Sequence, residues 1–308
     1  MVLRPRVACL FIGIWGTTFA ACAVAPPFEP GPEVHVVTTF SILGDWVRHV
    51  GGEGVSIHNL AGPGVDAHEF EPLPGDSATM TEADLVFAVG LGFETWLPDL
   101  AEAAAVTDRV VYLGDWIPEP RMRRISDSPS AALDPHVWQD PTLTADLVRA
   151  IADAFSAADP AGAAGYLSRS QTYLAELDAL DTEIASMVSE VPEASRQLVT
   201  SHATLGYFAD RYGFTVLGSV LPVSTETGSP SPGELAALID RVRASHVSAI
   251  FGERGESEQL LQVVAQEAGV DRVVLLYLDS LGAPGSDGAT YMDMMRSNAQ
   301  AIATALTP

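Results

Sequence analysis

PAGAAGYLSRSQTYLAELDALDTEIASMVSEV, residues 160–191, is the stretch that decides the fold. Apolar side chains recur in it at spacings of three and four residues, which predicts one amphipathic helix. After Pro160 it contains no proline until its end. At about 1.5 Å per residue, a helix of about thirty residues would extend roughly 45 Å, enough to run along a whole two-lobed molecule. The apolar positions are Tyr166, Leu167, Tyr173, Leu174, Leu177, Leu180, Ile184 and Val188.

Short β-branched runs and helical stretches alternate on both sides of this segment. Such alternation predicts βα units and mainly parallel sheets. The fold class is therefore α/β, with two α/β lobes joined by one long helix. Strands are expected at 34–39, 55–60, 85–89, 110–113, 197–200, 215–220, 249–252 and 272–278. Helices are expected at 42–50, 94–105, 140–157, 204–212, 233–245, 257–269 and 288–306, and the third of these begins at Asp140-Pro141, a capping pair.

The chain accordingly divides into five expected segments. They are a signal peptide (1–21), a lipid-anchored tether (22–33), an N-terminal α/β lobe (34–158), the linking helix (159–192) and a C-terminal α/β lobe (193–308).

The N-terminus is typical of a secretory signal. Arg4 and Arg6 precede an apolar run, residues 7–21, that is short for a membrane span. Phe19-Ala20-Ala21-Cys22 resembles a bacterial lipobox, in which the cysteine becomes the lipidated first residue, although phenylalanine replaces the usual leucine. We expect lipid on Cys22 and anchoring of the protein outside the cytoplasm. The alternative is a plain signal peptide and a soluble periplasmic protein.

Composition narrows the function. The formal net charge of −24 argues against a nucleic-acid partner, because phosphate binding needs a basic surface. The two cysteines, Cys9 and Cys22, both lie in or beside the signal. The mature body thus has neither a disulfide framework nor a thiolate metal site, and any metal must be held by His, Asp or Glu.

Three of the seven histidines lie at loop positions, and one aspartate ends the last expected strand: His68, His136, His202 and Asp279. Ligands of α/β sheets bind beyond the carboxyl ends of strands, so two facing lobes can each contribute two such groups. Spacing alone is a weak signal, because a single loop histidine is more often solvated or a cap partner. That structural interpretation is kept for the remaining histidines, His35, His49, His58 and His246.

Four segments, in order, resemble the zinc/manganese solute-binding lipoproteins of bacterial ABC importers. The first comprises residues 36–43, the segment around His68 and residues 83–94, and the second is Asp134-Pro135-His136-Val137-Trp138. The third is residues 201–213, SHATLGYFADRYG, and the last is Asp279-Ser280-Leu281-Gly282 followed by Tyr291 and Asn298. The resemblance covers about 34–306.

The resemblance implies that His68, His136, His202 and Asp279 are metal ligands at a site between the lobes. Histidine rather than glutamate at the third position is typical of the zinc subgroup, and three imidazoles with one carboxylate suit Zn²⁺. The expected function is capture of zinc and its delivery to the membrane permease of an ABC importer, by a monomer that is not an enzyme. Manganese, as Mn²⁺, is the alternative substrate.

Two departures from the family pattern stand out. Ala67 replaces a frequent proline, and the segment 118–133 is short, lacks histidine and carries Arg121, Arg123 and Arg124. Transfer from a metallochaperone through a metal-gathering loop is therefore not expected.

Two functions of other classes remain open. A zinc hydrolase would use three histidines as ligands and Asp279 as a base, but catalytic zinc keeps an open position that a fourth ligand closes. A surface adhesin would hold a structural metal that is never released.

Overall fold

Two four-stranded parallel sheets form the two lobes. The computed structural model describes residues 33–125, 131–221, 230–255 and 258–307, so Cys22 and the predicted signal peptide lie outside the described residues. The N-terminal lobe contains β1 (Val34–Phe40), β2 (Val55–Ala61), β3 (Leu85–Ala88) and β4 (Val110–Tyr112) in the order β2-β1-β3-β4. The C-terminal lobe repeats this pattern with β5 (Gln197–Thr200), β6 (Thr215–Ser219), β7 (Ile250–Glu253) and β8 (Val273–Leu276) in the order β6-β5-β7-β8.

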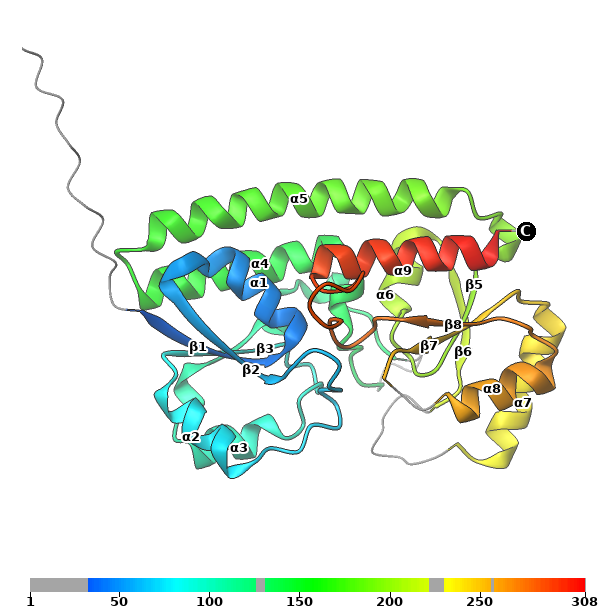
Figure 1. The fold of residues 1–308 in the computed structure, drawn as a ribbon, viewed down its shortest axis with the longest axis horizontal. Helices are drawn as coiled ribbons and strands as arrows, with labels where there is room; N and C mark the ends of the chain where they lie inside the picture. Colours follow the sequence, from blue (N-terminus) through cyan, green and yellow to red (C-terminus); the bar gives the residue numbers. More distant parts are fainter. Residues whose placement is uncertain (1–32, 126–130, 222–229, 256–257, 308) are drawn as a thin grey trace, which may run out of the picture. The chain divides into compact units, whose positions relative to one another are not determined.

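Helices cover both faces of each sheet (Figure 1). In the N-terminal lobe α1 (Ser41–Gly51) and α4 (Pro141–Ala158) lie on one face, and α2 (Pro74–Glu82) and α3 (Leu97–Ala103) lie on the other. In the C-terminal lobe α6 (Gly206–Tyr212) and α9 (Tyr291–Leu306) are opposite α7 (Pro232–Ser245) and α8 (Gln259–Ala268). Short 3-10 turns lie at Gly52–Gly54, Thr107–Arg109, Leu113–Trp116, Glu119–Arg121, Val137–Gln139 and Glu193–Ser195.

The linking helix is α5, Ala163–Ser189, and it confirms the prediction made from residues 160–191. Figure 1 shows it running along both lobes, with α1, α4 and α9 beneath it. Its predicted stripe is buried at Tyr166, Tyr173, Leu177, Leu180, Ile184 and Val188, whereas Leu167 is 43% exposed. Leu167 follows Tyr166 directly and so turns about 100° away from the stripe that packs on the core.

Polar side chains account for two of the boundaries that differ from the sequence prediction. The helix expected from residue 94 begins at Leu97, because the Glu94 carboxylate accepts from the backbone N–H groups of Val89 and Gly90 and closes a turn there. The last strand ends at Leu276 because the Asn298 amide takes over at Tyr277, accepting from its N–H at 3.0 Å and donating to its carbonyl at 2.6 Å. The side-chain amide thus replaces a strand partner.

The lobes meet at a buried junction. Trp138 Nε1 and Gln139 Nε2, from the N-terminal side, both donate to the Leu278 carbonyl, at 2.8 and 3.0 Å. The Leu281 N–H donates to Ser41 Oγ at 2.9 Å, and the Leu281 carbonyl accepts from the Gly64 N–H. Both lobes belong to one compact unit, and the two residues that flank Asp279-Ser280 are held from the opposite lobe.

In the described parts of the chain, every helix falls short of the length and apolar character needed for a membrane span.

Candidate metal centre

His68 lies on the long loop that follows β2. Its backbone N–H donates to Asp66 Oδ1 at 2.7 Å, which closes a tight turn. The loop is held further by Trp96, whose indole N–H donates to the Ala67 carbonyl at 2.8 Å. The imidazole packs edge-on against Phe93, with the ring centroids 4.3 Å apart. These contacts direct His68 Nε2 toward the junction of the lobes, and the side chain keeps 18% exposure.

His136 lies immediately before the 3-10 turn Val137–Gln139, and Asp134 fixes it. Asp134 Oδ1 accepts from the His136 backbone N–H at 3.1 Å and contacts His136 Nδ1 at 2.8 Å. A carboxylate oxygen only accepts, so the imidazole proton resides on Nδ1 and Nε2 is left with a lone pair. Nε2 lies 3.2 Å from His68 Nε2. Two imidazole nitrogens thus converge from the N-terminal lobe.

The C-terminal lobe contributes His202 and Asp279. His202 follows β5 and Asp279 follows β8, and both strands border β7, so their carboxyl ends lie at one edge of the sheet. His202 Nε2 and Asp279 Oδ2 are 2.7 Å apart. His202 is 8% exposed and Asp279 is fully buried.

The four side chains predicted from the sequence come together. One donor atom from each of His68, His136, His202 and Asp279 lies within 4.8 Å of the others. Asp279 Oδ2 lies 3.6 Å from His68 Nε2 and 3.8 Å from His136 Nε2. A tetrahedron with metal–ligand bonds of about 2.0–2.2 Å has edges of about 3.3–3.6 Å. The separations bracket that value, so the four donor atoms lie close enough together for one divalent ion to contact all of them.

The cluster is electrostatically biased toward a cation. Burial raises the pKa of Asp279, but the facing imidazoles His202, His136 and His68 outweigh burial and bring it to about 2. Asp279 is thus an anion at neutral pH. Nearby Asp66 shows the opposite shift, because burial and the negative charge of Asp279 raise its pKa to about 6. The negative charges of Asp66 and Asp279 repel each other.

Glu253, at the end of β7, is a polar residue of the site that the sequence prediction missed. It is 4% exposed. Its Oε1 accepts from the Asp279 backbone N–H at 2.8 Å, and its Oε2 lies 3.8 Å from His202 Nε2. Glu253 therefore fixes the backbone of Asp279 by a hydrogen bond. The available signal was a charged residue directly after the apolar run 249–252, at the carboxyl end of the strand between those of His202 and Asp279.

The other four histidines lie apart from the cluster, on the surface. His35 and His58 are exposed on β1 and β2. His49 contacts the Asp45 carbonyl and stacks on Tyr173 with centroids 4.5 Å apart. His246 ends α7 in the left-handed conformation, with φ 56°.

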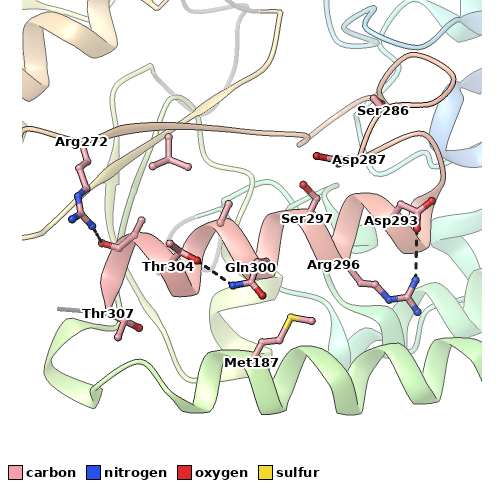
Figure 2. Close-up of a pocket in the computed structure, with 13 residues that line it drawn as sticks. Met187, Arg272, Ser286, Asp287, Asp293, Arg296, Ser297, Gln300, Thr304 and Thr307 are labelled. Atoms are coloured by element: carbon pink, nitrogen blue, oxygen red, sulfur yellow. Dashed lines mark hydrogen bonds and ion pairs between the residues drawn. The ribbon is translucent and has the colours of Figure 1, made fainter.

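Two hollows differ in character. One of about 410 Å³ borders the cluster and is lined by Asp66, Glu69, Ser201, Glu253, Arg254 and Ser280, among others. A larger one, about 1120 Å³, lies between α5, β8 and α9 (Figure 2). Its cations are already engaged: Arg296 contacts Asp293 and Glu183, and Arg272 donates to the Ala305 carbonyl. The smaller hollow is the one next to the cluster of candidate metal ligands.

The comparisons with known proteins identify the family of the chain. Residues 36–305 match the family model described as the periplasmic zinc-uptake complex component A. The manganese-binding lipoprotein MntA of Halalkalibacterium halodurans is 33% identical over 91% of this chain and 90% of its own. The iron-binding protein YfeA of Yersinia pestis is 28% identical over 97% of this chain and 95% of its own.

The structure of the periplasmic zinc-binding protein TroA from Treponema pallidum superimposes with a TM-score of 0.83 at 29% identity, covering 90% of this chain and all of that one. The chain belongs to the family of periplasmic metal-uptake components that includes these proteins. Three different metals stand in the names of the three relatives, so membership leaves the metal open.

Proposed function

We propose that this protein is the extracytoplasmic substrate-binding component of an ABC-type importer and that it captures zinc through His68, His136, His202 and Asp279. The convergence of three imidazole nitrogens and one carboxylate oxygen within 4.8 Å carries the proposal. Each lobe supplies two of the four donors, so a bound ion bridges the lobes. The membrane permease of the importer would receive the ion from this site.

The donor set favours zinc over manganese. Nitrogen-rich sites suit Zn²⁺, whereas Mn²⁺ prefers carboxylate, carbonyl and water oxygens. Manganese is the second candidate because MntA, at 33% identity, is named for it. At most nitrogen-containing sites zinc also binds more tightly than manganese on intrinsic affinity alone. Assigning the substrate therefore takes two measurements: the affinity of the protein for zinc, and direct competition between zinc and manganese.

Binding rather than catalysis fits the same donor set. Catalytic zinc sites have three protein ligands and one open position for water. Here Asp279 would supply a fourth protein donor, and Glu253 holds its backbone in place. We infer that the protein acts as a monomeric carrier and performs no hydrolysis. An assay of ester and peptide hydrolysis by the zinc-loaded protein is expected to show no turnover above free zinc.

Acid is expected to release the ion. Imidazole binds metal only when neutral, and an ordinary imidazole has a pKa of about 6.5, so protons compete with zinc as the pH falls. Asp279, with a pKa of about 2, stays ionised throughout this range and adds little to the pH dependence. Affinity measured by chelator competition at pH 7.5, 6 and 5 should fall steeply below about pH 6, with more than one proton taken up per zinc. A constant affinity from pH 5 to 7.5 would contradict a three-histidine site.

We also propose that lipid on Cys22 anchors the protein to the outer face of the membrane. The lipobox-like Phe19-Ala20-Ala21-Cys22 supports this, as does the word lipoprotein in the name of MntA. Cys22→Ser should move the protein from the membrane fraction to the soluble fraction. Cys9→Ser is the matched control, because Cys9 lies within the signal and should leave the distribution unchanged. A mature N-terminus at a residue other than Cys22 would refute the anchor.

A further inference from the structure

The arginine-bearing segment 118–133 has no part in the function described so far, yet one of its side chains reaches the opposite lobe. Arg123 Nη1 donates to the Gly206 carbonyl at 3.1 Å and to Asp210 Oδ2 at 2.6 Å, both on α6. The α6 helix follows the His202 loop. Arg121, two residues earlier, instead contacts Asp146 and Thr142 of α4, within its own lobe.

The same guanidinium also holds the carboxylate that orients His136. Arg123 Nε lies 3.2 Å from Asp134 Oδ2, while Asp134 Oδ1 lies 2.8 Å from His136 Nδ1. Asp134 is 2% exposed, so its charge needs a partner. A continuous chain of contacts therefore leads from Asp210 through Arg123 and Asp134 to His136.

The backbone of this segment is joined to α6 as well. Tyr207 Oη accepts from the Arg123 N–H at 3.0 Å and donates to the Asp134 carbonyl at 3.1 Å. Arg123 and Asp134 are also paired directly, because the Asp134 N–H donates to the Arg123 carbonyl. The Tyr207 hydroxyl of the C-terminal lobe thus bridges the backbones of Arg123 and Asp134.

Gly206 is required at the contact point. A Cβ atom at this position would lie 2.5 Å from Arg123 Nε and 2.7 Å from Asp134 Oδ2, distances at which something must move. The backbone of Gly206 is helical, so the need for glycine here is the space for the ion pair rather than an unusual φ. The start of α6 is fitted around the Arg123–Asp134 pair.

We propose that Arg123 is a positioning residue that ties Asp134 to α6. Through Asp134 it holds His136 in the metal-binding tautomer and fixes the position of His136 relative to the opposite lobe. This inference rests on the proposed function, in which His136 is a ligand. Partners of ligating imidazoles typically change metal affinity 10–100-fold when they are removed. Arg123 acts through one such partner, so its loss should cost about 10-fold, mainly as faster dissociation of the ion.

The test measures zinc affinity and dissociation rate by chelator competition on the full chain, with four variants. Arg123→Gln should bind about 10-fold more weakly. Gly206→Ala should do the same, although alanine is the better helix former. Arg123→Lys keeps the positive charge but loses the planar guanidinium with its several N–H donors. Its zinc affinity should therefore lie between those of Arg123→Gln and the native protein. Arg121→Gln is the matched control and should bind as the native protein does.

A second readout needs no metal. Long-range ¹H–¹⁵N spectra of the metal-free protein should show His136 protonated on Nδ1 in the native chain and a mixture of tautomers in Arg123→Gln. Native affinity and a native tautomer in both Arg123→Gln and Gly206→Ala would overturn the inference while leaving the proposed function intact. If His136→Ala itself binds zinc normally, the proposed function fails, and the tautomer measurement still decides whether Arg123 positions His136.

Discussion

His136→Ala should lose zinc affinity by more than about 100-fold, since changes even in the partners of ligands cost 10–100-fold. His136 is 2% exposed, and its Nε2 lies 3.2 Å from His68 Nε2 at the centre of the cluster. Its removal leaves three donors and a cavity where the imidazole was. The same loss is expected for alanine at His68, His202 and Asp279, measured by titration with zinc under chelator control.

His58→Ala is the matched control for that series. His58 is exposed on β2 and lies apart from the cluster, so its removal should leave zinc affinity unchanged. The native protein should bind one ion per chain. Native affinity in the His136→Ala protein, or a loss in His58→Ala equal to that in His136→Ala, would show that the ion is held elsewhere.

His202→Glu should narrow the preference for zinc over manganese by about an order of magnitude, because it replaces an imidazole nitrogen by a carboxylate oxygen. His202 Nε2 lies 2.7 Å from Asp279 Oδ2, so a glutamate at 202 would place two carboxylates side by side. Two adjacent anions repel each other unless a hard cation lies between them, which favours the oxygen-preferring ion.

Competition of the two ions for the native and His202→Glu proteins, at equal free concentration, measures this change. The native protein should prefer zinc by a wide margin. His58→Glu makes the same chemical change on an exposed strand and should keep the native ratio. A native protein that holds manganese as tightly as zinc would make manganese the substrate and refute the assignment made from the donor set.

Much of the architecture could be predicted because its signals are local. The stripe of residues 160–191 and the Asp140-Pro141 cap each lie within a few turns, and α4 and α5 form where they indicated, with the Asp140 side chain accepting from the Thr142 N–H. Strand boundaries set by distant side chains could not be predicted in this way. The end of β8 depends on Asn298, which lies 21 residues beyond Tyr277.

The same difference between local and distant signals applies to the residues of the site. The four clustered side chains were expected on the strength of a family resemblance, and spacing alone would have left each histidine as an ordinary loop residue. Two supporting residues, Glu253 and Arg123, were not predicted, because each acts across a sheet or between the lobes. Glu253 reaches Asp279 from the neighbouring strand, and Arg123 reaches Asp210 across 87 positions of sequence.

Diffraction from crystals of the zinc-loaded protein, measured on both sides of the zinc absorption edge, would locate the bound ion. We expect one anomalous peak per chain, within bonding distance (about 2.0–2.2 Å) of His68 Nε2, His136 Nε2, His202 Nε2 and an Asp279 carboxylate oxygen. A peak elsewhere in the molecule, or a peak at this position that lacks either the His136 or the Asp279 bond, would contradict it.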